Sequence, residues 1–110
     1  MPQPSTITFT GKSQESHECQ VHPLNRDWPD GIPAVYFIIR LTNSGDSFKQ
    51  TLLYIGETQD LKQRFLNHHK DECYNKNNAN MICILEVNNE EKRFEIEQDM
   101  IAAYQPPCNG

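Results

Sequence analysis

Long apolar stretches are missing from this sequence. No run approaches the roughly 18 apolar residues that a membrane-spanning helix needs, so we expect no contact with a membrane. Residues 1–10 have neither the basic start nor the apolar middle of a secretory signal. Repeats and low-complexity tracts are also lacking, and 110 residues fit one modest core. These absences predict a single small domain in the cytoplasm.

Closely spaced cysteine pairs are lacking too. The four cysteines are Cys19, Cys73, Cys83 and Cys108, and none forms a C-x-x-C pair. In a cytoplasmic protein, scattered cysteines are expected to be free thiols. His17, Cys19 and His22 bring three zinc-ligand types within six residues. Their spacing is not that of a zinc finger and no second pair follows, so a zinc-binding adaptor stays open only as an alternative.

Positive charge is scarce. Ten Lys and Arg residues stand against fifteen Asp and Glu residues, for a formal net charge of -5. Proteins that bind nucleic acid through bulk electrostatics are usually basic. Any nucleic-acid binding by this chain must therefore be local, or assisted by a metal ion or a partner.

Three segments have the residues of strands: 34–41, 51–55 and 81–87. They are rich in apolar and β-branched residues. The first two enclose a turn cluster within residues 42–50, which predicts an antiparallel hairpin. Its loop is expected to be longer than the two-residue optimum.

Two helices are predicted, at 60–70 and 90–104. Asp60 can cap the first, and prolines follow the second. Residues 71–80 have only partial helical potential. The fold class is therefore α/β (α+β), a three-stranded, mainly antiparallel sheet flanked by helices. Residues 1–32 are expected to be a polar lead-in, with a short edge strand at 6–10 and Trp28 packed on the domain. Residues 33–110 form the domain itself.

A possible phosphate site lies between the second strand and the first long helix. Gly56 ends the apolar strand that holds Tyr54 and lets the backbone approach a ligand closely. Arg64 and His68 are four residues apart, so they share one helix face. An arginine there suits a phosphate. The ordinary alternative is a core tyrosine beside a solvent-facing arginine and histidine.

Glu97 does not fit the pattern of the last helix. Stepped at about 100° per residue, one half of the helix holds Phe94, Ile96, Met100, Ile101, Ala103 and Tyr104. Glu97 lies near the middle of that apolar half. A carboxylate there must be paired or bound to a metal, because burying it alone is costly. Both a salt bridge to Arg40 or Arg64 and a hard cation such as Mg²⁺ stay open.

Together these pieces resemble the GIY-YIG nuclease family. Tyr54-Ile55-Gly56 matches the second half of the family signature, and Ala34-Val35-Tyr36 resembles the first. Four further residues match family positions in the right order: Arg64, His68, Glu97 and Asn109. The similarity runs from Pro33 to Asn109. Two departures are Ala34 in place of a glycine and Glu57 where a basic residue is common.

The resemblance implies a metal-dependent DNA endonuclease that hydrolyses phosphodiester bonds with one divalent ion, Mg²⁺ or Mn²⁺, on Glu97. Arg64 would hold the scissile phosphate. Tyr36 would accept a proton from the attacking water, with His68 as the rival base. Tyr54 would hydrogen-bond the phosphate or the water.

Asn109 is expected to fix the tail against the site. The chain has no room for a separate target-recognition domain, so specificity must come from DNA structure, a homodimer or a partner protein. A catalytically silent member of the same fold, which binds nucleic acid or a protein, is the alternative function.

Overall fold

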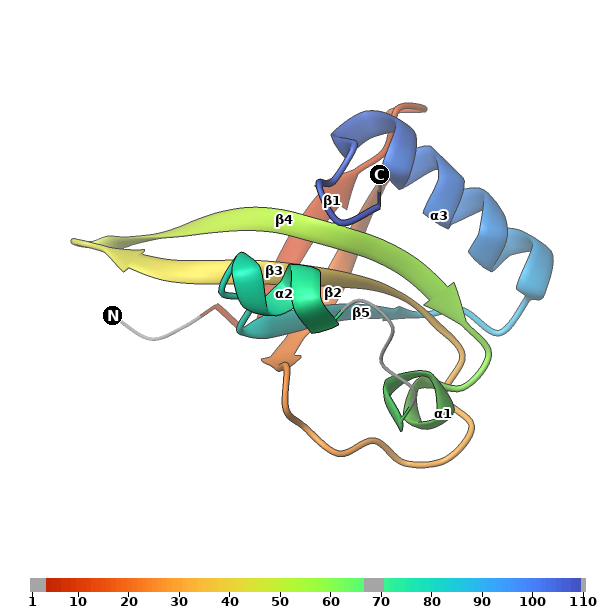
Figure 1. The fold of residues 1–110 in the computed structure, drawn as a ribbon. Coiled ribbons are helices and arrows are strands. Elements are labelled where there is room, and N and C mark those ends of the chain that lie inside the picture. Colours follow the sequence, from red (N-terminus) through yellow and green to blue (C-terminus); the bar gives the residue numbers. More distant parts are fainter. Residues whose placement is uncertain (1–3, 67–70, 110) are drawn as a thin grey trace.

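The computed structural model describes residues 4–66 and 71–109 (Figure 1). Its elements in chain order are β1 (Thr6–Thr10), β2 (Ser16–Pro23), β3 (Ala34–Ser44), β4 (Ser47–Thr58), α1 (Leu61–Leu66), α2 (Asp71–Lys76), β5 (Met81–Glu86) and α3 (Glu90–Tyr104). The expected mixed α/β class is confirmed. Within the described residues, no helix is both long and apolar enough to cross a bilayer.

The sheet has five strands, not the three that the sequence predicts. Its order is β1-β2-β5-β3-β4, and all neighbouring strands are antiparallel. The two extra strands come from the N-terminal segment: β1 confirms the expected edge strand, whereas β2 was missed. Most of β2 is at least partly exposed, so its sequence carries little of the apolar signal that predicts strands. The boundary proposed at residue 33 stays a prediction.

The β3–β4 hairpin is tighter than predicted. Pairing continues to Ser44 and Ser47, leaving a two-residue turn at Gly45-Asp46. Gly45 has a positive φ of 66°, which glycine adopts without strain. The expected long loop is therefore wrong, because polar residues on either side of the turn extend both strands.

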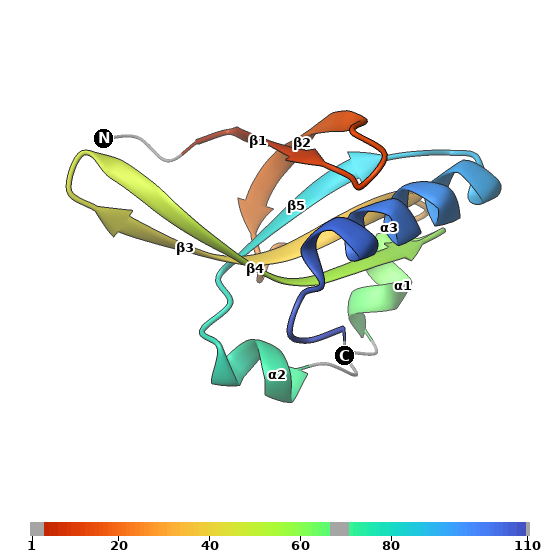
Figure 2. The same cartoon turned by 90° about the horizontal axis from the view of Figure 1, so that it is seen from above.

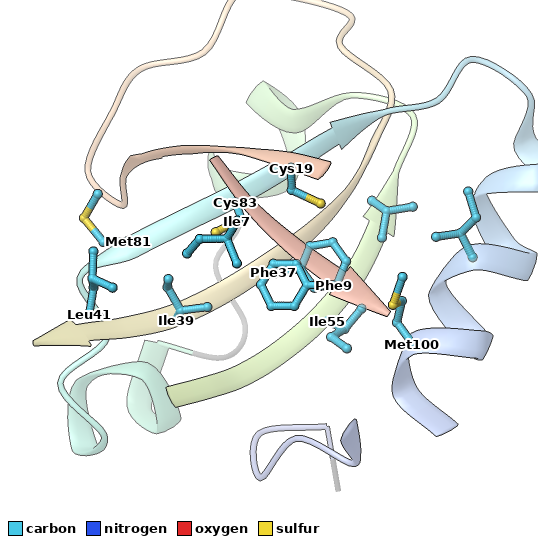
Figure 3. Close-up of a cluster of buried hydrophobic side chains, with 12 residues drawn as sticks. Ile7, Phe9, Cys19, Phe37, Ile39, Leu41, Ile55, Met81, Cys83 and Met100 are labelled. Carbon is cyan, nitrogen blue, oxygen red and sulfur yellow. The ribbon is translucent and has the colours of Figure 1, made fainter. Parts of the chain in front are cut away.

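One face of the sheet is curled around a hydrophobic core. Phe9 of β1 stacks on Phe37 of β3 at 4.2 Å between ring centroids, although two strands separate them in the sheet. Figure 3 shows the two rings together with Met100 of α3 beside them. Figure 2 shows α3 lying along this side of the sheet. The curl of the sheet and α3 together close this core.

The opposite face carries a second buried cluster. It joins strand residues to α1, α2 and the β2–β3 loop through Trp28, Tyr36, Tyr54, Leu61 and Tyr74, among others. Trp28 is only 7% exposed, which confirms that it packs the lead-in onto the domain. Both tyrosines of the predicted phosphate site lie in this cluster.

The prediction that all four cysteines are free thiols is wrong. A disulfide joins Cys73 of α2 to Cys108 of the tail, 35 residues apart. The chain reverses after α3 at Gln105, whose φ is 46°, and the Cys108 N–H then donates to the Leu53 carbonyl (2.8 Å). Cys19 and Cys83 are free and buried. Sequence spacing cannot reveal this pairing, because the turn of the tail creates it.

Candidate active site

Tyr36 and Tyr54 are brought together by the β3–β4 hairpin. Tyr36 lies opposite Gly56, and Ile38 lies opposite Tyr54. Their ring centroids are 6.0 Å apart, and both rings share a cluster with Leu61 at the start of α1. This confirms the predicted antiparallel neighbours with both tyrosines on the α1 face.

A β-bulge adjusts the strand beside Tyr54. The pairing shifts between Ile38 and Ile39, which face Tyr54 and Leu52 respectively. Leu53 is left as the extra residue, and it packs in the same cluster as Tyr54. Bulges commonly re-aim a side chain next to a functional site, and the carbonyl of this extra residue accepts the hydrogen bond from the tail.

Gly56 is required by close approach of the neighbouring rings. A Cβ at this position would lie 2.5 Å from both Cζ and the hydroxyl oxygen of Tyr36, and 2.9 Å from Cε2 of Tyr54. The Tyr36 ring therefore lies directly across the backbone of Gly56. The glycine predicted to allow a ligand close to the strand instead allows the phenol to occupy that space.

We expect Gly56→Ala to displace Tyr36. Forcing one methyl group into a packed site typically costs about 1–3 kcal/mol, and the shifted phenol should lose its bond to Arg64. Thermal unfolding should show the loss of stability. Wild-type stability in Gly56→Ala would contradict this account of the ring.

Arg64 reaches Tyr36 from α1. The helix begins after Asp60, whose Oδ1 accepts from the backbone N–H groups of Lys62 (3.1 Å) and Gln63 (3.4 Å), which confirms the predicted cap. Nε of Arg64 donates to the Tyr36 hydroxyl at 2.9 Å. The side chain is half-buried, which leaves part of the guanidinium open for a ligand.

The Tyr36–Arg64 pair stays in its ordinary protonation state. Burial raises the pKa of Tyr36 well above its usual range, and the hydrogen bond from Arg64 lowers it only in part. Burial alone lowers the pKa of Arg64, but the bond to Tyr36 and the nearby tyrosines leave it raised. A neutral phenol donates a hydrogen bond well and accepts a proton poorly at neutral pH.

Glu97 lies half-buried on α3. The residues of α3 that are buried are Arg93, Ile96 and Met100, whereas Phe94 is 56% exposed. The predicted apolar half was thus misplaced by including Phe94, Ala103 and Tyr104, all three of which are exposed. Glu97 borders the buried stripe instead of lying at its centre.

Electrostatics around Glu97 disfavour a bare charge. Desolvation raises the pKa of Glu97; the Gln98 side chain lowers it, the charge of Glu57 raises it and the charge of Arg64 lowers it. Gln98 Nε2 donates to its Oε1 at 3.0 Å. Among the described residues, no salt bridge joins Glu97 to Arg40 or Arg64. The salt-bridge alternative is therefore unsupported there.

Arg93 is a buried neighbour of the candidate site that sequence reasoning missed. It is only 4% exposed, and its Nε meets Oε2 of Glu57 at 2.9 Å. Its Nη1 also donates to the Val87 carbonyl at 3.2 Å. Arg93 lies four residues before Glu97, so the helix spacing together with the unusual acid at Glu57 was the available signal.

Glu97 fits a hard cation. It is a partly desolvated carboxylate with a second carboxylate nearby, and Mg²⁺ often uses one or two carboxylates while keeping several waters. In the described part of the chain, no group of three His, Cys, Asp or Glu side chains could hold a metal. A cation at Glu97 would therefore rely on water and substrate oxygens for its remaining ligands.

The structure does not support a zinc site at His17, Cys19 and His22. Cys19 is in the core on the α3 face, and burial, with a further effect of Cys83, raises its pKa to about 12. His22 lies on the other side of β2, edge-on to Trp28 at 5.5 Å. Because successive strand residues face opposite ways, His22, three residues after Cys19, points to the other face, so His17, Cys19 and His22 do not come together.

Asn109 fastens the tail to β4. Its Oδ1 accepts from Ile55 N–H and its Nδ2 donates to the Ile55 carbonyl, each at 2.8 Å. It thus holds the outer edge of the strand between Tyr54 and Gly56, as a positioning residue. His68 lies outside the described residues, so its expected place beside Arg64 stays a prediction.

The chain matches a known protein-family model. The model of the GIY-YIG catalytic domain matches residues 33–110. Neither the curated proteins nor the solved structures include a match to the chain. The matched range holds Tyr36, Tyr54, Arg64 and Glu97, and it leaves out β1, β2 and most of the loop that carries Trp28.

Proposed function

The chain belongs to the GIY-YIG family, and we propose that it is a metal-dependent DNA endonuclease that hydrolyses phosphodiester bonds. The observation that carries the proposal is the bond from Arg64 Nε to the Tyr36 hydroxyl. It fixes a half-exposed guanidinium next to two tyrosines. Such an arrangement suits a phosphate, because arginine presents a planar set of donors to its oxygens.

Each side chain has a role in the proposal. Arg64 binds the scissile phosphate and stabilises the charge that grows on it during the reaction. Tyr36 and Tyr54 donate hydrogen bonds that orient the phosphate or the attacking water. Glu97 holds one Mg²⁺ or Mn²⁺, which when bound polarises the phosphate and stabilises the leaving oxygen.

Tyr36 and His68 are the two candidates for the residue that accepts a proton from the attacking water. The raised pKa of Tyr36 favours it as a donor and counts against it as the base. His68 therefore becomes the preferred base in our proposal, on its spacing from Arg64 alone. Tyr36→Phe and His68→Ala would separate the roles by pH–rate profiles, since only loss of the base removes the dependence on its pKa.

A catalytically silent DNA- or protein-binding member remains the second candidate, and the net charge of -5 favours it. Linear, branched and single-stranded DNA, each incubated with Mg²⁺, Mn²⁺ or EDTA, tests the choice. We expect metal-dependent cleavage of at least one substrate. Specificity would then come from DNA structure, such as a branch, from a homodimer or from a partner protein. Binding without cleavage under every condition would support the silent alternative.

A cytoplasmic location also belongs to the proposal, but the Cys73–Cys108 disulfide counts against it. Disulfides persist mainly in oxidising compartments. Labelling of free thiols in freshly lysed cells would test the cytoplasmic location. In a protein from the reducing cytoplasm, Cys73 and Cys108 should both react with the reagent after denaturation.

A further inference from the structure

A hollow of about 430 Å³ opens beside α1, against the loop that joins β2 to β3. Arg26 and Trp28 line it from the loop, and Lys62 and Phe65 line it from the helix. Figure 1 shows this loop reaching α1. The volume lies within the roughly 300–1,000 Å³ of typical small-ligand sites, so the hollow admits a nucleotide but not a duplex.

The hollow adjoins the candidate active site through one residue, Phe65. Phe65 lines the hollow, and its ring meets the Tyr36 ring edge-on at 5.2 Å. Lys62 and Arg64 extend from the same short helix. A second hollow of about 500 Å³ shares Leu24 with the first and continues away from the site. A strand bound at Arg64 would reach the hollow past Phe65.

The walls carry the two features that bind single strands, flat π surfaces and cations. The guanidinium carbon of Arg26 lies 4.6 Å from the centroid of the Trp28 ring. Trp28 is buried below while Arg26 is exposed, so the outer plane of the guanidinium faces open space. Bases stack on arginine planes as well as on aromatic rings, and Phe65 offers a half-buried ring nearby.

Cations gather here although the chain is acidic. Lys62 keeps 45% of its side chain exposed while pairing with Asp30 at 3.1 Å, and Arg26 bonds His22 Nδ1 at 2.9 Å. The carboxylate of Asp27, which also lines the hollow, would repel a phosphate. The two cations are thus held in place at a hollow whose Phe65 also contacts Tyr36.

We propose that this hollow binds an unpaired nucleotide of the DNA strand next to the scissile phosphate. The proposal rests on the nuclease function above and names its substrate class as DNA with an unpaired segment. The base stacks on Arg26 and Phe65, and Lys62 contacts the adjoining phosphate. Because the loop precedes the family match at 33–110, this contact is an addition to the catalytic domain.

Binding without cleavage tests the proposal. Fluorescence anisotropy in EDTA would compare a labelled single strand of about 12 nucleotides, within the usual ~4–16 nucleotide site sizes, with a duplex of equal length. For Arg26→Gln/Lys62→Gln we expect roughly tenfold weaker single-strand binding. The slope of log K against log salt should become shallower by about 0.7, for the one phosphate contact that Lys62 makes. Duplex binding should hardly change.

Matched variants keep the result interpretable. Lys62→Gln alone removes only an exposed ion pair, so it serves if the double variant unfolds. Asp27→Asn should tighten single-strand binding. Lys92→Gln, at an exposed position of α3, should leave it unchanged. Equal losses on both DNAs, or no loss with Lys62→Gln and the double variant, would overturn the proposal. If wild type never cuts but binding still depends on Arg26 and Lys62, the nuclease function fails while the hollow stands.

Discussion

Arg64→Lys should reduce DNA cleavage by about 10²–10³-fold, the usual effect of removing one stabiliser of transition-state charge. Lysine keeps the positive charge but lacks the planar donors that grip two phosphate oxygens. It also cannot reproduce the bond from Nε to the Tyr36 hydroxyl. Initial cleavage rates at saturating Mg²⁺ would measure the loss, with binding followed separately in EDTA.

The fold should tolerate Arg64→Lys. The side chain is only half-buried, and losing one hydrogen bond typically costs about 1 kcal/mol. Arg40→Lys, the same substitution at an exposed position of β3, is the matched control and should leave both cleavage and stability unchanged. If Arg64→Lys unfolds the domain, Arg64 is a structural residue and its role at phosphate is wrong.

The parts of the fold that the sequence predicts are those with a strong local signal. β3 is buried along most of its length, and the cap at Asp60 forms between neighbours in the chain. β2 was missed because half-exposed strands lack continuous apolar character. The Cys73–Cys108 disulfide depends on how the tail folds back over β4, which no local pattern records.

The candidate site was likewise predicted only where the signal is local. The pairing of Tyr36 with Tyr54 follows from a hairpin, and a hairpin is readable from two strands and a turn. The bond between Arg64 and Tyr36 spans 28 residues and needs the angle at which α1 leaves β4. The place of Arg93 beside Glu57 was hidden because a lone charged residue on a helix is ordinarily exposed.

Glu97→Gln should abolish metal-dependent cleavage, with a loss of at least about 10²–10³-fold. The amide nearly preserves the shape of the side chain but is a poor ligand for a hard cation. Calorimetric titration of Mg²⁺ should show weaker binding in the variant. Glu95→Gln, an exposed glutamate on the same helix, is the matched control and should bind metal and cut DNA as wild type does.

The metal-free stability of Glu97→Gln gives an independent test. Desolvation is the largest cause of the raised pKa of Glu97, so its ionised form destabilises the fold. The variant should therefore melt at a higher temperature than wild type above that raised pKa. The difference should vanish as pH falls below the ordinary carboxyl pKa of about 4.3, where the glutamate is neutral in both folded and unfolded chains.

The opposite result would identify a structural residue. If Glu97 is half of a buried ion pair, neutralising it strands the partner and costs roughly 3–5 kcal/mol. Melting temperature would then fall at neutral pH, and the loss would shrink in acid as the wild-type pair also breaks. A variant that is strongly destabilised, or that still cuts DNA with Mg²⁺, removes Glu97 from the metal site and leaves Arg64 with the tyrosines as the only supported phosphate contact.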